Sequence, residues 1–224
     1  MKMQRENLID LLAAETAGLV RPHPVRVAVD GIDAAGKTIL ADELGRRLEE
    51  MDRSVIRASI DGFHHPREIR YQRGKDSAEG YYRDSFDYEA VKKVLLEPLG
   101  PDGKLTYQKA VFDHQENRPI NMDFQKARSD AILLFDGVFL LRPEMYAYWD
   151  IKIFVDIEFD ESTARAIKRD VPLLGNEELV RERYKKRYIP GQMLYFVESS
   201  PKEKADFIVK NDKVSNPEII KKSG

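Results

Sequence analysis

The chain has 224 residues, of which 42% are hydrophobic and 34% are charged, and its formal net charge at pH 7 is −2. This length suits a single domain with a sizeable core, and the near balance of charges argues against binding to nucleic acid or a membrane surface. The absence of cysteine excludes disulfides, thiol nucleophiles and cysteine-ligated metals. Because there is neither an apolar signal-peptide core nor an apolar run approaching ~18 residues, we expect a cytoplasmic protein.

The N-terminal segment is expected to form a helix ahead of the main domain. Its leucines recur at the spacing of one helix face within residues 2–17, and Pro22 and Pro24 end the pattern. The expected division of the chain is a helical extension at residues 1–24, a main domain at 25–212 and a tail at 213–224.

Short apolar segments alternate with helical patterns along the main domain. Strands are predicted at residues 25–29, 54–59, 131–135, 151–155 and 205–209. Helices are predicted at 37–51, at 87–97 with Asp87 as N-cap, at 160–169 with Asp160 as N-cap, and from a loop at 171–176 to Tyr188. Residues 62–86 are expected to be irregular, and 105–112 extended. The alternation predicts an α/β fold, a mainly parallel sheet of about five strands with helices on both faces.

A phosphate-binding loop is predicted between the first strand and the helix that follows it. The pattern G-x-x-x-x-G-K-[ST] is matched by Gly31, Ile32, Asp33, Ala34, Ala35, Gly36, Lys37 and Thr38. Backbone amides of such a loop, together with a helix N-terminus, bind phosphates. Lys37 would contact the β- and γ-phosphates, and Thr38 would ligate Mg²⁺. A dinucleotide site is disfavoured because the G-x-G start is missing, so we predict a P-loop NTPase-type fold that binds ATP and Mg²⁺, with GTP left open as donor.

Two carboxylates follow predicted strands, where ligands bind in open α/β sheets. Asp61 comes after the second strand, and Asp136 closes the strand at 131–135. Phosphoryl transfer needs one acid to take the acceptor proton and one near Mg²⁺. We assign Asp61 to the first role and Asp136 to the second, although both could equally be turn-forming residues before glycine. Asp156 is expected to be structural.

With these residues, the chain resembles the uridine kinase, phosphoribulokinase and pantothenate kinase group of P-loop kinases over about residues 25–211. The motifs that carry the resemblance are the loop at 31–38 and the stretches at 59–66, 86–88, 111–114, 135–138 and 167–170. The resemblance implies an ATP-dependent kinase that phosphorylates a hydroxyl of a small metabolite, with Asp61 as catalytic base. It also implies that Lys37 and Arg169 take part in catalysis.

A small lid is implied at about residues 165–185, where Arg165 and Arg169 would reach over the triphosphate. Arg165 could instead pair with Glu161 one helical turn away. The acceptor implied is a nucleoside, with pantothenate or a sugar as the alternative. Uridine kinases carry an arginine-flanked glycine where this chain has Leu-Gly-Asn at 174–176, and the stretch at 61–66 is closer to that of pantothenate kinases.

The acceptor pocket is expected to draw on the irregular segment and on the loop near residue 114. Candidate contacts are His64, Tyr82, His114 and Arg118. Each also has a structural interpretation, as an aromatic packed locally or a surface charge. No structural zinc is predicted, and a homo-oligomer is left open. A nucleotide-binding switch that hydrolyses ATP or GTP slowly is the alternative of another class.

Overall fold

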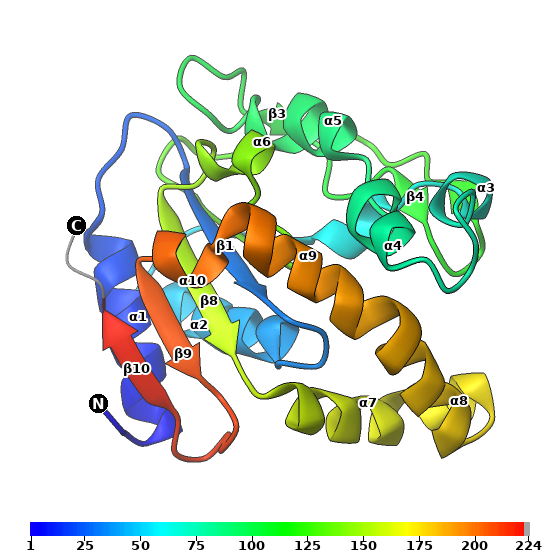
Figure 1. Cartoon of the computed structure of the whole chain (residues 1–224). Coiled ribbons are helices and arrows are strands. Elements are labelled where there is room, and N and C mark those ends of the chain that lie inside the picture. Colours follow the sequence, from blue (N-terminus) through cyan, green and yellow to red (C-terminus); the bar gives the residue numbers. More distant parts are fainter. Residues whose placement is uncertain (222–224) are drawn as a thin grey trace.

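The computed structural model describes residues 1–221; residues 222–224, part of the expected tail, lie outside the described residues. Its centre is a six-stranded sheet in the order β10-β9-β8-β1-β7-β2 (Figure 1). Five of these strands are parallel and correspond to the five predicted from the sequence, which confirms the α/β fold class. The bounds are β1 (Val25–Gly31), β2 (Val55–Ser59), β7 (Ile132–Gly137), β8 (Ile151–Asp156), β9 (Phe207–Lys210) and β10 (Glu218–Lys221).

The central strands are apolar because both of their faces are covered. Along β1, Val27 and Val29 face one core cluster and Ala28 faces the other, and all three are fully buried. The first cluster is covered by the helices α1 (Arg5–Gly18) and α2 (Lys37–Glu50). The second includes residues of α5 (Tyr88–Val91), the π-helical turn η2 (Lys92–Leu96) and α9 (Ile189–Ser199).

The first helix and the strand at 218–221 both pack on the central sheet, although they belong to the expected extension and tail. Leu8 and Leu12 of α1 are buried against α2 and the sheet. Residues 218–221 form β10, which pairs antiparallel with β9, and Met3 N donates to Pro217 O at 3.1 Å. The helix α1 thus buries part of one face of the sheet, and β10 pairs with the edge of β9 that would otherwise be open.

Between β2 and β7 the chain makes only short elements. The turn η1 (Ile60–Phe63) carries the end of β2 into this region, and Asp87 caps α5 as predicted, accepting from Ala90 N at 2.9 Å. The others are α3 (Arg67–Arg70), α4 (Ala78–Asp84), β3 (Thr106–Tyr107), β4 (Phe112–Asp113), β5 (Arg118–Pro119) and β6 (Gln125–Lys126), and α6 (Pro143–Tyr146) follows β7.

After β8 the chain forms α7 (Phe159–Leu174), α8 (Glu177–Arg183), the π-helical turn η3 (Tyr184–Tyr188), α9 and α10 (Pro201–Lys204). Two predictions are corrected here. Glu158 rather than Asp160 holds the N-cap position, and the helix continues through the expected loop at 171–174. The break comes at Gly175, whose φ of +100° favours glycine, and Asn176 then caps α8.

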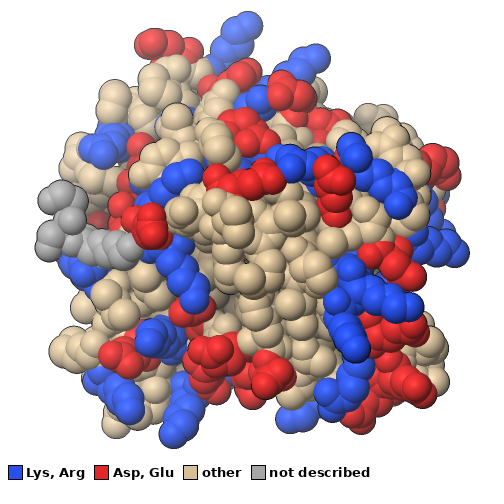
Figure 2. All heavy atoms as spheres, in the orientation of Figure 1, with Lys and Arg blue, Asp and Glu red and all other residues tan. Residues whose placement is uncertain are grey.

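On the face of the molecule drawn in Figure 2, acidic and basic side chains are interspersed around a central strip with few charges. This strip lies where α9 runs in Figure 1, and Met193 and Val197 of that helix are exposed. Within the described residues, every helix is too short or too polar to cross a membrane. The expected location and oligomeric state stay predictions.

Candidate functional site

The loop at residues 31–38 joins β1 to α2 in a conformation that its glycines permit. Gly36 has φ +92°, and a Cβ there would lie 2.9 Å from Asn211 Nδ2. Gly31 has φ +151°, and a Cβ there would lie 2.3 Å from Val155 O. Both positions therefore exclude larger side chains, because the backbone turns tightly and passes close to β8 and to the segment after β9.

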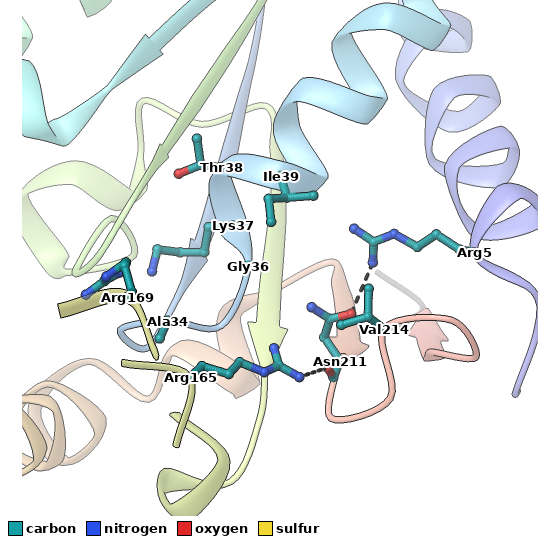
Figure 3. Close-up of a pocket in the computed structure, with 10 residues that line it drawn as sticks. All are labelled: Arg5, Ala34, Gly36, Lys37, Thr38, Ile39, Arg165, Arg169, Asn211 and Val214. Carbon is teal, nitrogen blue, oxygen red and sulfur yellow. Dashed lines mark hydrogen bonds between the residues drawn. The ribbon is translucent and has the colours of Figure 1, made fainter. Parts of the chain in front are cut away.

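A pocket of about 390 Å³ opens beside this loop (Figure 3). Its lining is basic and partly apolar: Arg5, Ala34, Gly36, Lys37, Thr38, Ile39, Arg165, Arg169, Asn211 and Val214. The concentration of cations at a helix N-terminus suits a polyanion such as a triphosphate. Ile39 and Val214 add exposed apolar surface at the rim, which the nucleobase of a nucleotide could cover.

Lys37 is held ready within the loop. Its Nζ donates to the carbonyl oxygen of Ile32 at 2.7 Å. Burial lowers the pKa of Lys37, while the nearby carboxylates of Asp33, Asp30 and Asp136 act to raise it. These carboxylates favour the ammonium form, which can exchange one backbone oxygen for a phosphate oxygen.

Thr38 and Asp136 meet at the carboxyl ends of β1 and β7. Thr38 Oγ1 donates to Asp136 Oδ2 at 2.7 Å, and the Asp136 residue is 2% exposed. A hydroxyl beside a carboxylate fits the donor set that Mg²⁺ prefers. The sequence did not indicate Arg57, whose Nη2 lies 2.9 Å from Asp136 Oδ1. Arg57 compensates the buried charge, and only the neighbouring strands β2 and β7 bring these two residues together.

Asp61 lies in η1, at the carboxyl end of β2. Asp61 is exposed, and desolvation by the surrounding residues of the site raises its pKa, opposed by His114. Asp136 also raises this pKa, while Lys37 and Arg169 lower it. The structure therefore brings the predicted base into electrostatic reach of the metal-side acid, the loop lysine and a lid arginine.

Three of the four predicted acceptor contacts, His64, His114 and Arg118, lie on the same side of the site as Asp61 or on the loop beside it. His64 Nδ1 lies 3.0 Å from Asp61 O, and its ring stacks on His114 at 4.7 Å. Burial lowers the pKa of His64 to about 3, so this ring is neutral at physiological pH. Arg118 is exposed in β5, opposite Asp113. His64 and His114 thus lie beside Asp61, and Arg118 is on the rim of their loop.

Tyr82 is not at the acceptor site, which corrects its assignment. It is 1% exposed, its hydroxyl lies 3.3 Å from Ser199 Oγ, and Arg142 lies over its ring at 4.7 Å. Its neighbour Tyr81 points the other way and donates to Asp33 Oδ2 at 2.7 Å. Successive residues of a helix differ by about 100° in direction, so the helical phase of α4 decides which tyrosine reaches the loop.

Arg165 forms the alternative pair with Glu161 and also lines the pocket. Its Nε donates to Glu161 Oε1 at 2.7 Å, and its Nη2 donates to Asn211 O at 2.7 Å across the pocket (Figure 3). Arg169 lies one turn further along α7 and forms two hydrogen bonds to Asp170 at 2.6 and 2.9 Å. Both arginines line the pocket from the predicted lid.

The loop is braced by residues that sequence reasoning missed. Asp33 N donates to Gln192 Oε1 at 2.8 Å, and Ser162 Oγ donates to Asp33 O at 2.6 Å. On the other side, Asn211 Nδ2 donates to Ala35 O at 2.8 Å. These partners come from α9, α7 and the end of β9, so no local pattern in the loop could have indicated them.

Arg5 extends this bracing to the N-terminal helix. Its Nη1 donates to Asn211 Oδ1 at 3.1 Å, and its Nε donates to Glu43 Oε2 at 2.8 Å (Figure 3). Because Asn211 accepts through Oδ1, its Nδ2 is directed toward the nucleotide loop. The only sequence signal was the position of Arg5 at the start of a predicted helix.

Comparison with known proteins places this site in context. No protein-family model matches the chain. Uridine-cytidine kinase B of Dictyostelium discoideum is 29% identical over 193 residues, 84% of this chain and 74% of that protein. Uridine kinase of Ligilactobacillus salivarius is 28% identical over 83% of this chain and 84% of its own length. Among solved structures, a possible uridine kinase from Bacillus stearothermophilus superposes with a TM-score of 0.73 at 21% identity, over 91% of this chain and 97% of that one.

These relatives confirm the resemblance to the uridine kinase group of P-loop kinases, and the superposition confirms the fold. These matches cover 84% and 83% of this chain.

Proposed function

We propose that this chain is an ATP-dependent kinase that transfers the γ-phosphoryl group of ATP to a hydroxyl of a small metabolite. The observation that carries the proposal is the meeting of three parts at one edge of the sheet. These are the loop with Lys37, the Thr38–Asp136 pair and the carboxylate of Asp61. Because the relatives are named for uridine and cytidine, a nucleoside is the first acceptor to test.

The donor side is built from the nucleotide loop and the proposed lid at about residues 165–185. Backbone amides of the loop and the start of α2 would hold the phosphates, with Lys37, Arg165 and Arg169 supplying positive charge. Thr38 and Asp136 would hold Mg²⁺, which neutralises charge on the phosphates. The expected roles of Lys37, Thr38, Arg165 and Arg169 are supported by their common position around one pocket. Asp136 is linked to this pocket by the hydrogen bond that it accepts from Thr38.

The acceptor side depends on Asp61 as a base. As the acceptor oxygen bonds to the γ-phosphorus, the bond between that phosphorus and the β–γ bridging oxygen breaks, ADP leaves, and the hydroxyl proton passes to Asp61. A raised carboxylate pKa suits this role, because a stronger base takes the proton more readily. His64, His114 and Arg118 would contact the acceptor near this group.

Pantothenate or a sugar is the second candidate acceptor. The observation that favours it is the stretch at 61–66, which resembles pantothenate kinases, together with a lid glycine flanked by residues other than arginine at 174–176. The alternative of another class, a switch that hydrolyses a nucleoside triphosphate slowly, would not respond to any acceptor.

The test is ADP release by purified protein with MgATP or MgGTP and a panel of nucleosides, pantothenate and sugars. A kinase shows ADP release that depends on one class of acceptor, with one phosphorylated product per ADP. Slow release that is the same with every acceptor would favour the switch. Failure to bind MgATP or MgGTP by calorimetry would remove the proposal altogether.

A further inference from the structure

Arg70, the last residue of α3, is a buried cation without a partner. It is 8% exposed, and its enclosed Nε has no hydrogen-bond partner. Within residues 1–221 its guanidinium makes neither an ion pair nor a hydrogen bond, and its contact is with the ring of Tyr71, 5.6 Å away. Arginine stays charged at any ordinary pH, so a buried and unpaired guanidinium destabilises the ligand-free protein.

The charges nearest to Arg70 do not compensate it. Arg67 and Arg187 are both close enough to lower its pKa further, after the larger effect of burial. Arg187 is 3% exposed and donates to backbone oxygens of Lys75 at 3.2 Å and Ser77 at 3.0 Å. The three arginines therefore form a positive cluster in which the described residues supply backbone oxygens but no carboxylate.

Other arginines of the same segment are paired, so the lack of a partner is specific. Arg73 is three residues away, and its Nε lies 2.8 Å from Asp84 Oδ2. Arg83 lies 2.6 Å from Glu198 Oε1. The carboxylates of Asp84 and Glu198 thus pair with Arg73 and Arg83, and neither pairs with Arg70.

Ring contacts and electrostatic effects link the cluster to the proposed base and to the nucleotide loop, and the guanidinium of Arg187 lies 5.5 Å from the ring of Tyr81. On one side, the charge of Arg70 contributes to the lowered pKa of His64, which contacts the backbone of Asp61. On the other side, Tyr188 is close enough to affect the pKa of Arg70, and its ring lies 4.9 Å from that of Tyr81. The hydroxyl of Tyr81 in turn donates to Asp33 of the loop, as described above.

We propose that Arg70, within the positive field of Arg67 and Arg187, binds an anionic group of the acceptor, a carboxylate or a phosphate. This inference rests on the proposed kinase activity and refines its acceptor: the substrate carries a negative group as well as the hydroxyl that is phosphorylated. A guanidinium binds such groups through paired N–H donors. The unpaired buried charge is then compensated when the acceptor binds.

The first experiment compares acceptors that differ only in charge. The matched pairs are pantothenate and pantothenol, D-glycerate and glycerol, and ribose 5-phosphate and ribose, with uridine alongside; the carboxylate and phosphate pairs distinguish the two anions. We expect the wild type to favour the anionic member of one pair. Arg70→Gln should lower kcat/KM for that anion about 10- to 100-fold, mainly through KM, the range for one charged hydrogen-bonded contact.

The controls separate charge recognition from folding. Arg70→Lys should recover part of the preference for the anion, and Arg73→Gln, which loses a surface ion pair, should leave it unchanged. The KM for ATP should stay within about twofold in all three variants, since a surface pair contributes little.

A second experiment measures melting temperature with MgADP saturating the nucleotide loop. Arg70→Met should melt at or above the wild-type temperature without acceptor, because an apolar side chain of similar length removes an uncompensated charge. The anionic acceptor should raise the melting temperature of the wild type and not that of Arg70→Met. A structural role for Arg70 predicts the opposite, a large loss of stability in Arg70→Met.

Two results would overturn the inference. If uridine or another neutral acceptor is the best substrate and Arg70→Gln uses it as well as the wild type, the acceptor needs no anion while the kinase activity stands. If the protein binds no nucleoside triphosphate, the proposed function and the refinement of its acceptor fail together.

Discussion

At the scale of single residues, the two carboxylates of the site have different surroundings. Asp136 is buried, and its two carboxylate oxygens accept hydrogen bonds from Thr38 and Arg57. Among residues 1–221, none donates a hydrogen bond to the side chain of Asp61, and desolvation raises its pKa. Asp136 is thereby suited to hold a metal cation, and Asp61 is suited to accept a proton.

The role of Asp61 can be tested by removing its charge. Asp61→Asn should lower kcat by about 10² or more, because the amide cannot take the acceptor proton. The Kd for MgATP should stay close to that of the wild type, as measured by calorimetry. The control is Asp123→Asn, an exposed aspartate far along the chain, and normal turnover by Asp61→Asn would refute the assignment.

Removal of Lys37 should affect both nucleotide binding and turnover. Lys37 lies in the pocket and would contact the phosphates, so Lys37→Ala should weaken MgATP binding and lower kcat as well. Fluorescence titration with a labelled nucleotide gives the first quantity, and ADP release gives the second. Unchanged binding by Lys37→Ala would place the phosphates elsewhere.

Asp30 gives a prediction for stability. It is fully buried beside the loop, and burial raises its pKa from the usual 3.8 to about 6, opposed by hydrogen bonds from Tyr195 and Gly31 N. A raised folded-state pKa contributes stability below pH 3.8 that is lost as the pH rises to 6.

The stability of the wild type relative to Asp30→Asn should therefore fall by about 3 kcal/mol between about pH 3.5 and pH 7. Urea unfolding at several pH values measures the difference, with Asp123→Asn as the control. Parallel stability curves for the wild type and Asp30→Asn would contradict the expected protonation.

Residue-level prediction from the sequence rested on short motifs. The Lys37–Thr38 pair and Asp136 were found because strand, loop and helix occur in one run of sequence. Tyr81 was missed in favour of Tyr82, because an irregular segment gives no helical phase. Arg70 was missed because nothing local shows that a charged residue will be buried without a partner.

At the scale of elements, α1 reaches the nucleotide pocket although it begins the chain. Arg5 orients the amide of Asn211, which in turn binds a carbonyl oxygen of the loop. The strands were predicted well, since buried parallel strands are rich in apolar residues. The packing of α1 was not, because an amphipathic pattern does not identify the surface that it covers.

Loss of the Arg5 contact should loosen the loop. Arg5→Ala leaves Asn211 free to turn away from the loop, and we expect the Kd for MgATP to rise about tenfold, the effect of one lost buried hydrogen bond. The matched control is Arg47→Ala, which also breaks an ion pair between α1 and α2, to Asp10, but at the surface. Equal effects from both variants would mean that Arg5 acts only by holding the two helices together.

At the scale of the whole molecule, the described fold is built around one sheet, which α1 covers and β10 extends. The α/β class, the parallel sheet and the position of the cradle follow from alternating local patterns, which the sequence carries. The edge strand β10 does not, because its pairing depends on the exposed edge of β9 and on contacts with the first residues.

The inclusion of α1 can be measured as stability. Leu12→Ala should destabilise the protein by about 2–5 kcal/mol, as expected for a buried leucine, and the transition in urea should stay single. Leu11→Ala, at a half-buried position of the same helix, should cost clearly less. A separate early transition for α1, or equal losses, would show that the helix is an appendage.

The Asn211 contact also has a consequence for how the protein matures on the ribosome. The cradle at 31–38 is synthesised early, yet the amide that braces Ala35 comes from residue 211, and the first residues pair with β10 near the C-terminus. A nascent chain therefore contains the complete loop sequence before the residues that contact the loop in the folded protein have been synthesised. Tight nucleotide capture should appear only after residue 211 and the strand at 218–221 have been synthesised and have folded onto the loop and the first residues.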